Sequence, residues 1–316
     1  MENLKTENEV DDFFEPAFNT EQLMKSAKRK SIFRITGVSF FVSICVIVLL
    51  ILLKMQLTPY FMHQKIVAKE LYYELYGANI YTGNWQENYQ LIGSSATAPT
   101  YKLLNGKPLY LGDLSLNTST IEPTIGSSEF EQFSYKGHRV MNFFHPSIQY
   151  EAYANDLNRL DQVSNGKLIE MSLSFDKPYT YEQVIGLLPK DVTLQWNWVN
   201  TFTADEIAGE SSAQDRTIFK EQEVVGFPTR AKDGTPIEEP IYSFISTLKD
   251  AKKSGGSYQE EFEQIYTTLQ NGQKAITDKS IEIIGVVVVG NKQQLSTLKN
   301  QPYIQASSFG AIVDIF

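Results

Sequence analysis

Residues 35–53 read ITGVSFFVSICVIVLLILL, and this stretch decides how the rest of the chain is organised. It contains no charged residue. As a helix it would be roughly 28 Å long at about 1.5 Å per residue, close to the thickness of the hydrocarbon core of a bilayer. A single span has to be helical, because an unpaired backbone amide is costly in lipid. We therefore predict one membrane-spanning helix over residues 35–53.

Two other interpretations of this stretch are weaker. A buried core helix would need a second stretch of comparable apolarity to pack against, and the sequence has none. A cleaved signal peptide is disfavoured because 34 residues precede the stretch. In addition, Lys54, Met55 and Gln56 stand where a cleavage site of small residues would be expected.

The basic residues that flank the span predict its orientation. Five of them crowd the N-terminal side: Lys25, Lys28, Arg29, Lys30 and Arg34. The C-terminal side has Lys54 and then no further Lys or Arg before Lys65. Because cytoplasmic flanks carry the excess of Lys and Arg, we expect the N-terminus in the cytoplasm and residues 54–316 outside the cell membrane.

Composition limits what the outer part can do. The chain has 37 acidic and 28 basic residues, and most of the acidic excess follows the span, which argues against nucleic acid as a direct ligand. The only cysteine, Cys45, lies within the span, so the exterior has no disulfide. The three histidines, His63, His138 and His145, fit no metal-ligand spacing. We therefore expect no catalytic residues, no metal and no cofactor.

The N-terminal arm, residues 1–34, sets aromatic side chains in an acidic background. Seven acids precede Lys25, and Phe13, Phe14 and Phe18 lie among or just after them. An arm of this length cannot bury three phenylalanines by itself. One interpretation is a disordered tail whose aromatic rings lie in the lipid interface. We favour a segment that folds on a basic cytoplasmic partner, with Phe13, Phe14, Phe18 and Leu23 as anchors.

A helix start is predicted at the end of this arm. Asn19 has the residue type of an N-cap, and Gln22 follows three positions later to complete a capping box. Phe18 and Leu23 occupy the positions of a hydrophobic staple. We expect a helix from about Thr20 that continues into the basic residues.

The first outer region, residues 54–160, is predicted to be a helical stalk followed by a β-rich part. Apolar residues recur at helical spacing from Leu57, with Pro59 early enough to kink the helix rather than abolish it, and Gly77 is a natural helix end. Asn105-Gly106 between alternating runs predicts a hairpin. Residues 112–150 look irregular and are expected to have little internal order. Four aromatic residues of this region could line a glycan-binding face, but we favour a role in core packing. They are Tyr76, Tyr81, Trp85 and Tyr89.

The second outer region, residues 161–316, alternates strand and helix patterns. Strands are predicted at 168–175, 192–199, 281–289 and 309–315, and helices at 179–188, 241–253, 258–271 and 291–300. Residues 203–223 look like a linker. The order predicts an α+β fold with a ferredoxin-like or related split arrangement. We thus expect four parts: the N-terminal arm (1–34), the membrane span (35–53), the stalk with the β-rich region (54–160) and the α+β region (161–316).

Three stretches are informative together. They are SAKRKSIFRITGV at 26–38, ELYGANIYTGNW at 74–85, and an outer module running from SLSFDKPYTYEQVIGLLP at 172–189 to IIGVVVVGNKQQLSTLKNQPYIQASSFGAIVD at 283–314. They resemble the sigma factor regulator family of Firmicutes, which are membrane-anchored anti-sigma factors, those of Bacillus included, with paired N- and C-terminal regulator domains. The resemblance implies that the arm sequesters an extracytoplasmic-function sigma factor until an envelope signal arrives.

The resemblance runs from about Lys25 onward. The partner contacts proposed within residues 1–19 therefore rest on the physical argument alone. The arm has no Cys or His, and it therefore lacks the zinc-type anti-sigma signature. The sequence leaves open whether a second small membrane protein is a partner, since Ser39 and Ser43 share a helix face. The competing hypotheses are a bitopic scaffold of the wall-synthesis or division machinery and, less favoured, an envelope enzyme.

Overall fold

The computed structural model describes residues 20–90, 93–117 and 138–315. The chain divides into two compact units, Met1–Thr58 and Pro59–Phe316. In the first unit the described residues belong to helix α1 (Thr20–Leu75), which begins where the sequence predicts it. The apolar side chains from Ile35 to Leu53 are exposed along this helix, as expected of a surface that faces lipid.

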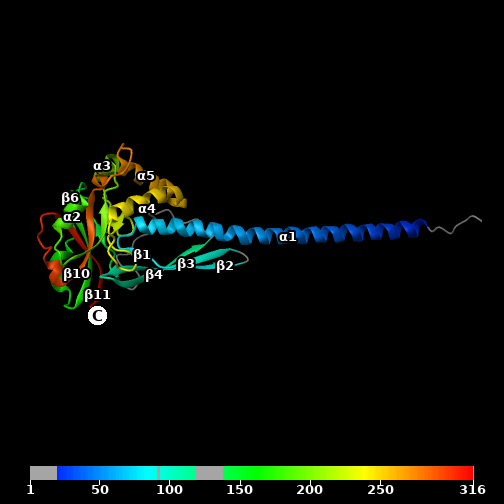
Figure 1. Cartoon of the computed structure of the whole chain (residues 1–316), viewed down its shortest axis with the longest axis horizontal. Helices are drawn as coiled ribbons and strands as arrows, with labels where there is room; N and C mark the ends of the chain where they lie inside the picture. Colours follow the sequence, from blue (N-terminus) through cyan, green and yellow to red (C-terminus); the bar gives the residue numbers. More distant parts are fainter. Residues whose placement is uncertain (1–19, 91–92, 118–137, 316) are drawn as a thin grey trace, which may run out of the picture. The chain divides into compact units, whose positions relative to one another are not determined.

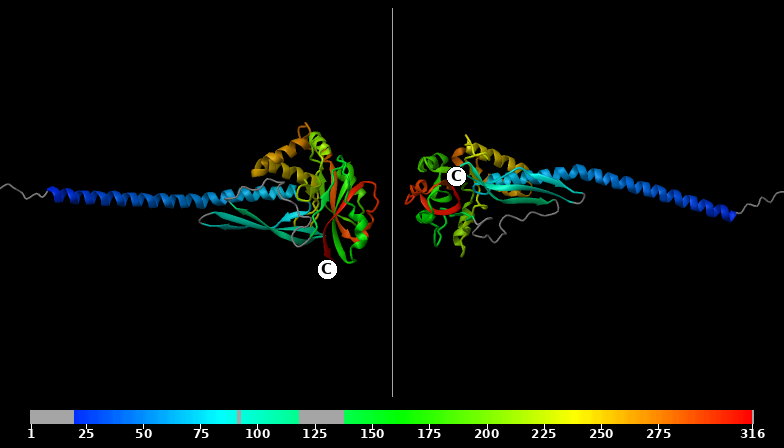
Figure 2. Two further views of the ribbon diagram at one scale, coloured as in Figure 1. Left: turned by 180° about the vertical axis from the view of Figure 1, so that it is seen from behind. Right: turned by 90° about the horizontal axis from the view of Figure 1, so that it is seen from below.

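The second unit begins with the last turns of α1. Pro59 lies inside the helix, which ends at Leu75, and Gly77 has a φ of +85°, so the predicted helix end is confirmed. Met62 and Ile66 on these turns are buried against Ala96 and Leu116. The predicted stalk is therefore packed along a β-hairpin (Figure 2).

That hairpin belongs to a four-stranded antiparallel sheet. Its strands are β1 (Ile80–Thr82), β2 (Gln86–Tyr89), β3 (Ser94–Leu104) and β4 (Lys107–Asn117). Asn105 and Gly106 join β3 to β4 with φ angles of 52° and 79°, the left-handed values that a two-residue type I′ turn requires. The predicted hairpin is confirmed, and its strands are longer than the alternating runs indicated.

The larger sheet has the split arrangement. Its antiparallel order is β11-β6-β10-β7-β9, built from β6 (Lys167–Tyr179), β7 (Thr193–Val199), β9 (Gly226–Pro228), β10 (Ile283–Asn291) and β11 (Ile304–Asp314). Helix α2 (Tyr181–Leu187) joins β6 to β7, and α6 (Lys292–Ser296) joins β10 to β11 (Figure 1). Each βαβ unit leaves a gap that a strand of the other unit fills, which confirms the ferredoxin-like prediction.

A long insertion separates the two βαβ units. It contains α3 (Ala204–Ser212), β8 (Phe219–Lys220), β9, α4 (Pro240–Ser254) and α5 (Gln259–Gln270). The last two helices were predicted, but the linker expected at 203–223 is wrong because α3 and β8 lie within it. Helix α3 has no buried residue, and hence no apolar periodicity to reveal it. Its capping box, Thr203 with Glu206, was the available signal.

The two faces of the larger sheet are buried by different kinds of structure. We call the side of Ile169, Met171, Leu173 and Phe175 the helix face, because these residues join one apolar cluster with residues of α2, α4, α5, α6 and the last turns of α1. The alternate residues of β6, from Glu170 to Ser174, lie on the opposite side. We call that side the segment face.

An irregular segment, residues 138–157, covers the segment face and contains β5 (Asn142–Phe143), which pairs with β8. Met141, Phe143 and Phe144 of this segment are buried with Trp196 and Trp198 of β7. The low order expected for residues 112–150 is therefore wrong for both described parts, residues 112–117 in β4 and residues 138–150. The described residues of the second unit also form three short 3-10 helices, at Asp156–Gln162, Gly256–Tyr258 and Asp278–Ser280.

Candidate functional site

The predicted partner-binding residues lie mostly outside the part of the chain that the structure describes. Phe13, Phe14, Phe18 and Asn19 fall there, so their roles stay predictions. Gln22 and Leu23 lie in the first turns of α1, and Leu23 is 50% exposed. A half-exposed leucine on the first turns of a helix is available to a partner, but nothing in the structure brings it together with the phenylalanines.

The basic residues predicted to orient the span follow on the same helix. Lys25, Lys28, Arg29, Lys30 and Arg34 are all exposed, and Lys25 lies 3.9 Å from Glu21 in an i, i+4 ion pair. Among the described residues, α1 is the one helix long and apolar enough to cross a membrane, with a mean hydropathy of 2.9 in its most apolar window. This is the pattern of a single-pass membrane protein. The orientation of its ends stays a prediction.

Deep in the second unit, three charged side chains meet. The Lys102 ammonium on β3 donates to Glu170 Oε2 on β6 at 2.8 Å and to Glu221 Oε2 after β8 at 2.7 Å. All three side chains are at most 1% exposed. The backbone amides of Met141 and Ala311 donate to Glu221 and Glu170, respectively, and Asn79 Nδ2 donates to Glu170 Oε1 at 2.7 Å. We call these side chains the buried ion network.

The network has one excess negative charge, and this changes how its members titrate. Burial raises the pKa of the Glu221 carboxyl, and the neighbouring Glu170 raises it further, against the opposing effect of Lys102. Burial lowers the pKa of Lys102, but the two carboxylates outweigh it, so the pKa of the ammonium is raised overall. Lys102 therefore stays charged. A Cβ at position 310 would overlap the Glu170 carboxylate, so this place requires Gly310.

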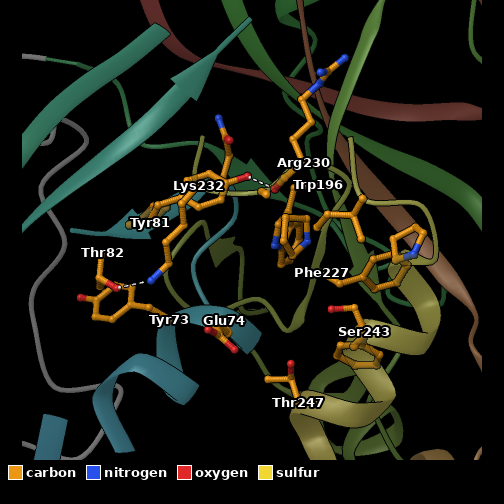
Figure 3. A pocket seen from close by; sticks show the side chains of 17 residues that line it. Tyr73, Glu74, Tyr81, Thr82, Trp196, Phe227, Arg230, Lys232, Ser243 and Thr247 are labelled. Atoms are coloured by element: carbon orange, nitrogen blue, oxygen red, sulfur yellow. Dashed lines mark hydrogen bonds between the residues drawn. The ribbon is translucent and has the colours of Figure 1, made fainter. Parts of the chain in front are cut away.

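A pocket of about 210 Å³ opens beside this network, where the end of α1, β1, β7, β9 and α4 meet. Its apolar wall comes from the rings of Trp196, Phe227, Phe244 and Tyr81. Figure 3 shows Lys232 and Glu74 on one side of the pocket, with Ser243 and Thr247 of α4 across from them. The sequence pointed to Tyr81 only as an aromatic residue and gave no sign of this pocket.

Several polar groups of the pocket have protein partners. Lys232 Nζ is 3.4 Å from Thr82 Oγ1, and the Tyr81 hydroxyl donates to the carbonyl of Arg230 at 3.1 Å. Loss of water raises the pKa of the Glu74 carboxyl, while Lys232 and a hydrogen bond from Thr247 oppose that rise. The guanidinium of Arg230 donates to the Gly234 carbonyl and points away from the pocket (Figure 3).

The pocket has features of a site that binds a small molecule. It combines buried rings with a carboxyl, an ammonium and hydroxyl groups. Within the described ranges, no group of three or more His, Cys, Asp or Glu side chains could hold a metal ion. The arrangement can hold a small polar molecule against an apolar wall.

Comparison with known proteins decides the family. Residues 160–311 match the family described as sigma factor regulator C-terminal. This part of the chain belongs to the sigma factor regulator family. No curated protein and no solved structure matches it.

The family match covers β6 to β11 and the insertion between them, so the ferredoxin-like sheet and its insertion form the C-terminal domain of a sigma factor regulator. Membership supports an anti-sigma factor role with a sigma factor as partner, and the family is regulatory rather than enzymatic. A narrower likeness, to the anti-sigma-M factor of Bacillus, is not confirmed by this match. The division of the outer part at residue 160 also stays a prediction.

Proposed function

We propose that this sigma factor regulator is a transmembrane anti-sigma factor. Its N-terminal arm holds an extracytoplasmic-function sigma factor at the inner side of the membrane and releases it when the outer domain registers envelope stress. The observation that carries the proposal is a sigma factor regulator domain on the same chain as one apolar helix of spanning length. The basic residues before the span support the placement of the arm in the cytoplasm.

The arm is proposed to bind through its apolar anchors. Phe13, Phe14, Phe18 and Leu23 would fill clefts on the sigma factor, while the acids around them complement a surface that also contacts DNA. Truncation of one buried aromatic anchor to alanine costs about 2–4 kcal/mol of binding, which corresponds to roughly 30- to 1,000-fold in affinity.

The test uses the full chain in its host, with reporters for each extracytoplasmic-function promoter. The wild-type chain should silence one reporter and co-purify with one sigma factor. Alanine at all four anchors should relieve that silencing and abolish capture while the protein stays in the membrane. Unchanged capture by this variant would show that the anchors are assigned wrongly.

A matched control replaces polar residues of the same arm. Asn3→Ala, Thr6→Ala and Asn8→Ala change the arm to a similar extent without removing an anchor, so sigma capture should persist. If the wild-type chain silences no reporter and deletion of residues 1–24 has no effect on the cell, the scaffold hypothesis would replace the proposal.

A further inference from the structure

The pocket beside the buried ion network presents two opposite charges to one small cavity. The Glu74 carboxyl lies on the last turn of α1, and the Lys232 ammonium lies in the loop after β9. The Lys232 ammonium has Thr82 as its polar neighbour, while Lys232 and Thr247 both oppose the rise that burial causes in the pKa of the Glu74 carboxyl. The 3.4 Å separation between Lys232 Nζ and Thr82 Oγ1 is long for a hydrogen bond, so the ammonium keeps donor capacity for a ligand.

A third polar residue connects the lining of the pocket to the buried ion network. Asn79 lines the cavity and is 1% exposed. Its Nδ2 donates to Glu170 and to the Leu103 carbonyl, but among the described residues its Oδ1 has no hydrogen-bond partner. This oxygen is enclosed by protein atoms and does not reach a ligand, so the charge contacts of a ligand fall to Glu74 and Lys232.

The size and the walls of the pocket narrow the class of ligand. A volume of about 210 Å³ is below the roughly 300–1,000 Å³ of pockets for drug-sized molecules, which excludes an oligosaccharide. The rings of Trp196, Phe227 and Phe244 offer an apolar contact surface. The ligand should therefore be one small unit that has a cation, an anion and an apolar group.

We propose that this pocket binds a free amino acid with an apolar side chain, in its zwitterionic form. The ammonium of the ligand would bind the Glu74 carboxylate, and its carboxylate would bind Lys232. The apolar side chain would contact Trp196 and Phe227. This site is independent of the proposed function, because ligand binding is measured directly on the chain and needs no sigma factor.

The first experiment measures binding to the full chain in detergent micelles by calorimetry. The probes are L-leucine, leucinamide, which lacks the carboxylate, and N-acetylleucine, which lacks the ammonium. L-leucine should bind with an affinity in the micromolar to millimolar range, and each analogue should bind at least tenfold more weakly. If L-leucine does not bind at millimolar concentration, or if N-acetylleucine binds equally well, the proposal is wrong.

Single substitutions then assign each charge. Glu74→Gln should weaken L-leucine binding about tenfold and remove the preference over N-acetylleucine, since a lost charge contact is worth about 1.4 kcal/mol or more. Lys232→Met should weaken L-leucine binding to a similar extent and remove the preference over leucinamide. Glu260→Gln and Lys249→Met change matched charges outside the pocket lining and should leave binding unchanged.

A blocking variant separates ligand binding from folding. Ser243 is exposed on α4 at the rim of the pocket, so Ser243→Phe should fill the cavity without disturbing the core. Binding of L-leucine should be lost while the unfolding midpoint stays at the wild-type value. Undiminished binding by this variant would place the amino acid elsewhere on the protein and overturn the assignment.

Discussion

The two faces of strand β6 are equally buried but are stabilised by different interactions. On the helix face Ile169, Met171, Leu173 and Phe175 of β6 are 0% exposed and contact other apolar side chains. On the segment face the alternate residues are Glu170, Ser172 and Ser174, at most 1% exposed and all polar. One strand thus stabilises the fold by burial of apolar area on one side and by hydrogen bonds on the other.

The reason lies in what covers each face. Helices satisfy their own backbone hydrogen bonds, so the residues below them need only be apolar and of suitable size. The segment 138–157 is largely irregular and needs partners from the sheet. Ser174 Oγ accepts from the Phe144 amide at 2.9 Å, and Ser172 Oγ donates to the Asn142 carbonyl at 2.7 Å. The Asp156 carboxylate likewise accepts from the Phe309 amide at 2.9 Å.

The largest loss of stability that this comparison predicts is at the buried ion network. Lys102→Met removes the cation that pairs with two buried carboxylates and should cost about 3–5 kcal/mol of unfolding free energy, because these carboxylates then lose their ion pairs. The measurement is denaturant unfolding of the full chain in micelles, followed by tryptophan fluorescence. Lys190→Met, at an exposed position, is the control and should change the midpoint little.

A second substitution distinguishes lost charge pairing from lost packing. In the Lys102→Met background, Glu170→Gln removes one of the two unpaired carboxylates and should restore part of the lost stability. No recovery in the double variant would mean that the Lys102 stem, rather than its charge, stabilises this side of the sheet.

The next prediction compares neighbouring residues of β6 on opposite faces. Leu173→Ala opens a cavity in the helix-face cluster and should cost about 2–5 kcal/mol. Ser172→Ala removes one donor from the Asn142 carbonyl and should cost less, about 1–3 kcal/mol. Both are measured as shifts of the denaturant midpoint at constant slope. Equal costs at the two positions would show that the two faces do not differ as described.

The sequence predicted the helix face well and the segment face poorly. The apolar run 281–289 and the alternation in 168–175 indicated β10 and β6, because burial of apolar side chains leaves a periodic pattern. The expected order of strands and helices then gave the split arrangement. Helix α3 was missed because it buries no residue, so it has no such pattern.

The candidate site could not be predicted, since its parts come from distant positions. Lys102 and Glu221 are 119 positions apart, and no spacing rule connects a single lysine to a single glutamate across that distance. The pocket likewise combines Glu74 of α1 with Lys232 of a loop. The arm residues could be proposed from the sequence because an aromatic cluster in an acidic tail is a local signal, and they stay a prediction. The network and the pocket exist only in the folded chain.

A smaller effect is expected from the histidine of the segment face. His145 is buried, and the Ser147 amide donates to its Nδ1, so the ring proton is on Nε2, 3.3 Å from Asn200 Oδ1. Burial lowers the pKa of His145. The unfolded chain therefore binds more protons than the folded chain once the pH falls below about 6.5, and stability should decrease there.

The check is unfolding free energy against pH, from about pH 7.5 to about pH 5.5, the window in which a histidine with a lowered pKa gains its proton on unfolding. His145→Gln should flatten this part of the curve. His63→Gln, at an exposed position of α1, should leave the slope unchanged. A wild-type curve without a slope in this window would mean that His145 is not held neutral by its surroundings.

The smallest predicted effect is the loss of a helix N-cap. It compares a helix that covers the sheet with one that does not. Thr180 and Thr203 both close capping boxes, at the starts of α2 and α3. Val184 of α2 is buried on the helix face, so Thr180→Ala should lower the unfolding free energy by about 1 kcal/mol. Helix α3 buries no residue. Thr203→Ala should therefore increase amide exchange within α3 while the global midpoint stays constant. If Thr203→Ala lowered the global unfolding free energy as much as Thr180→Ala, α3 would take part in the cooperative fold. The contribution of a cap to stability would then not depend on burial of its helix on the helix face.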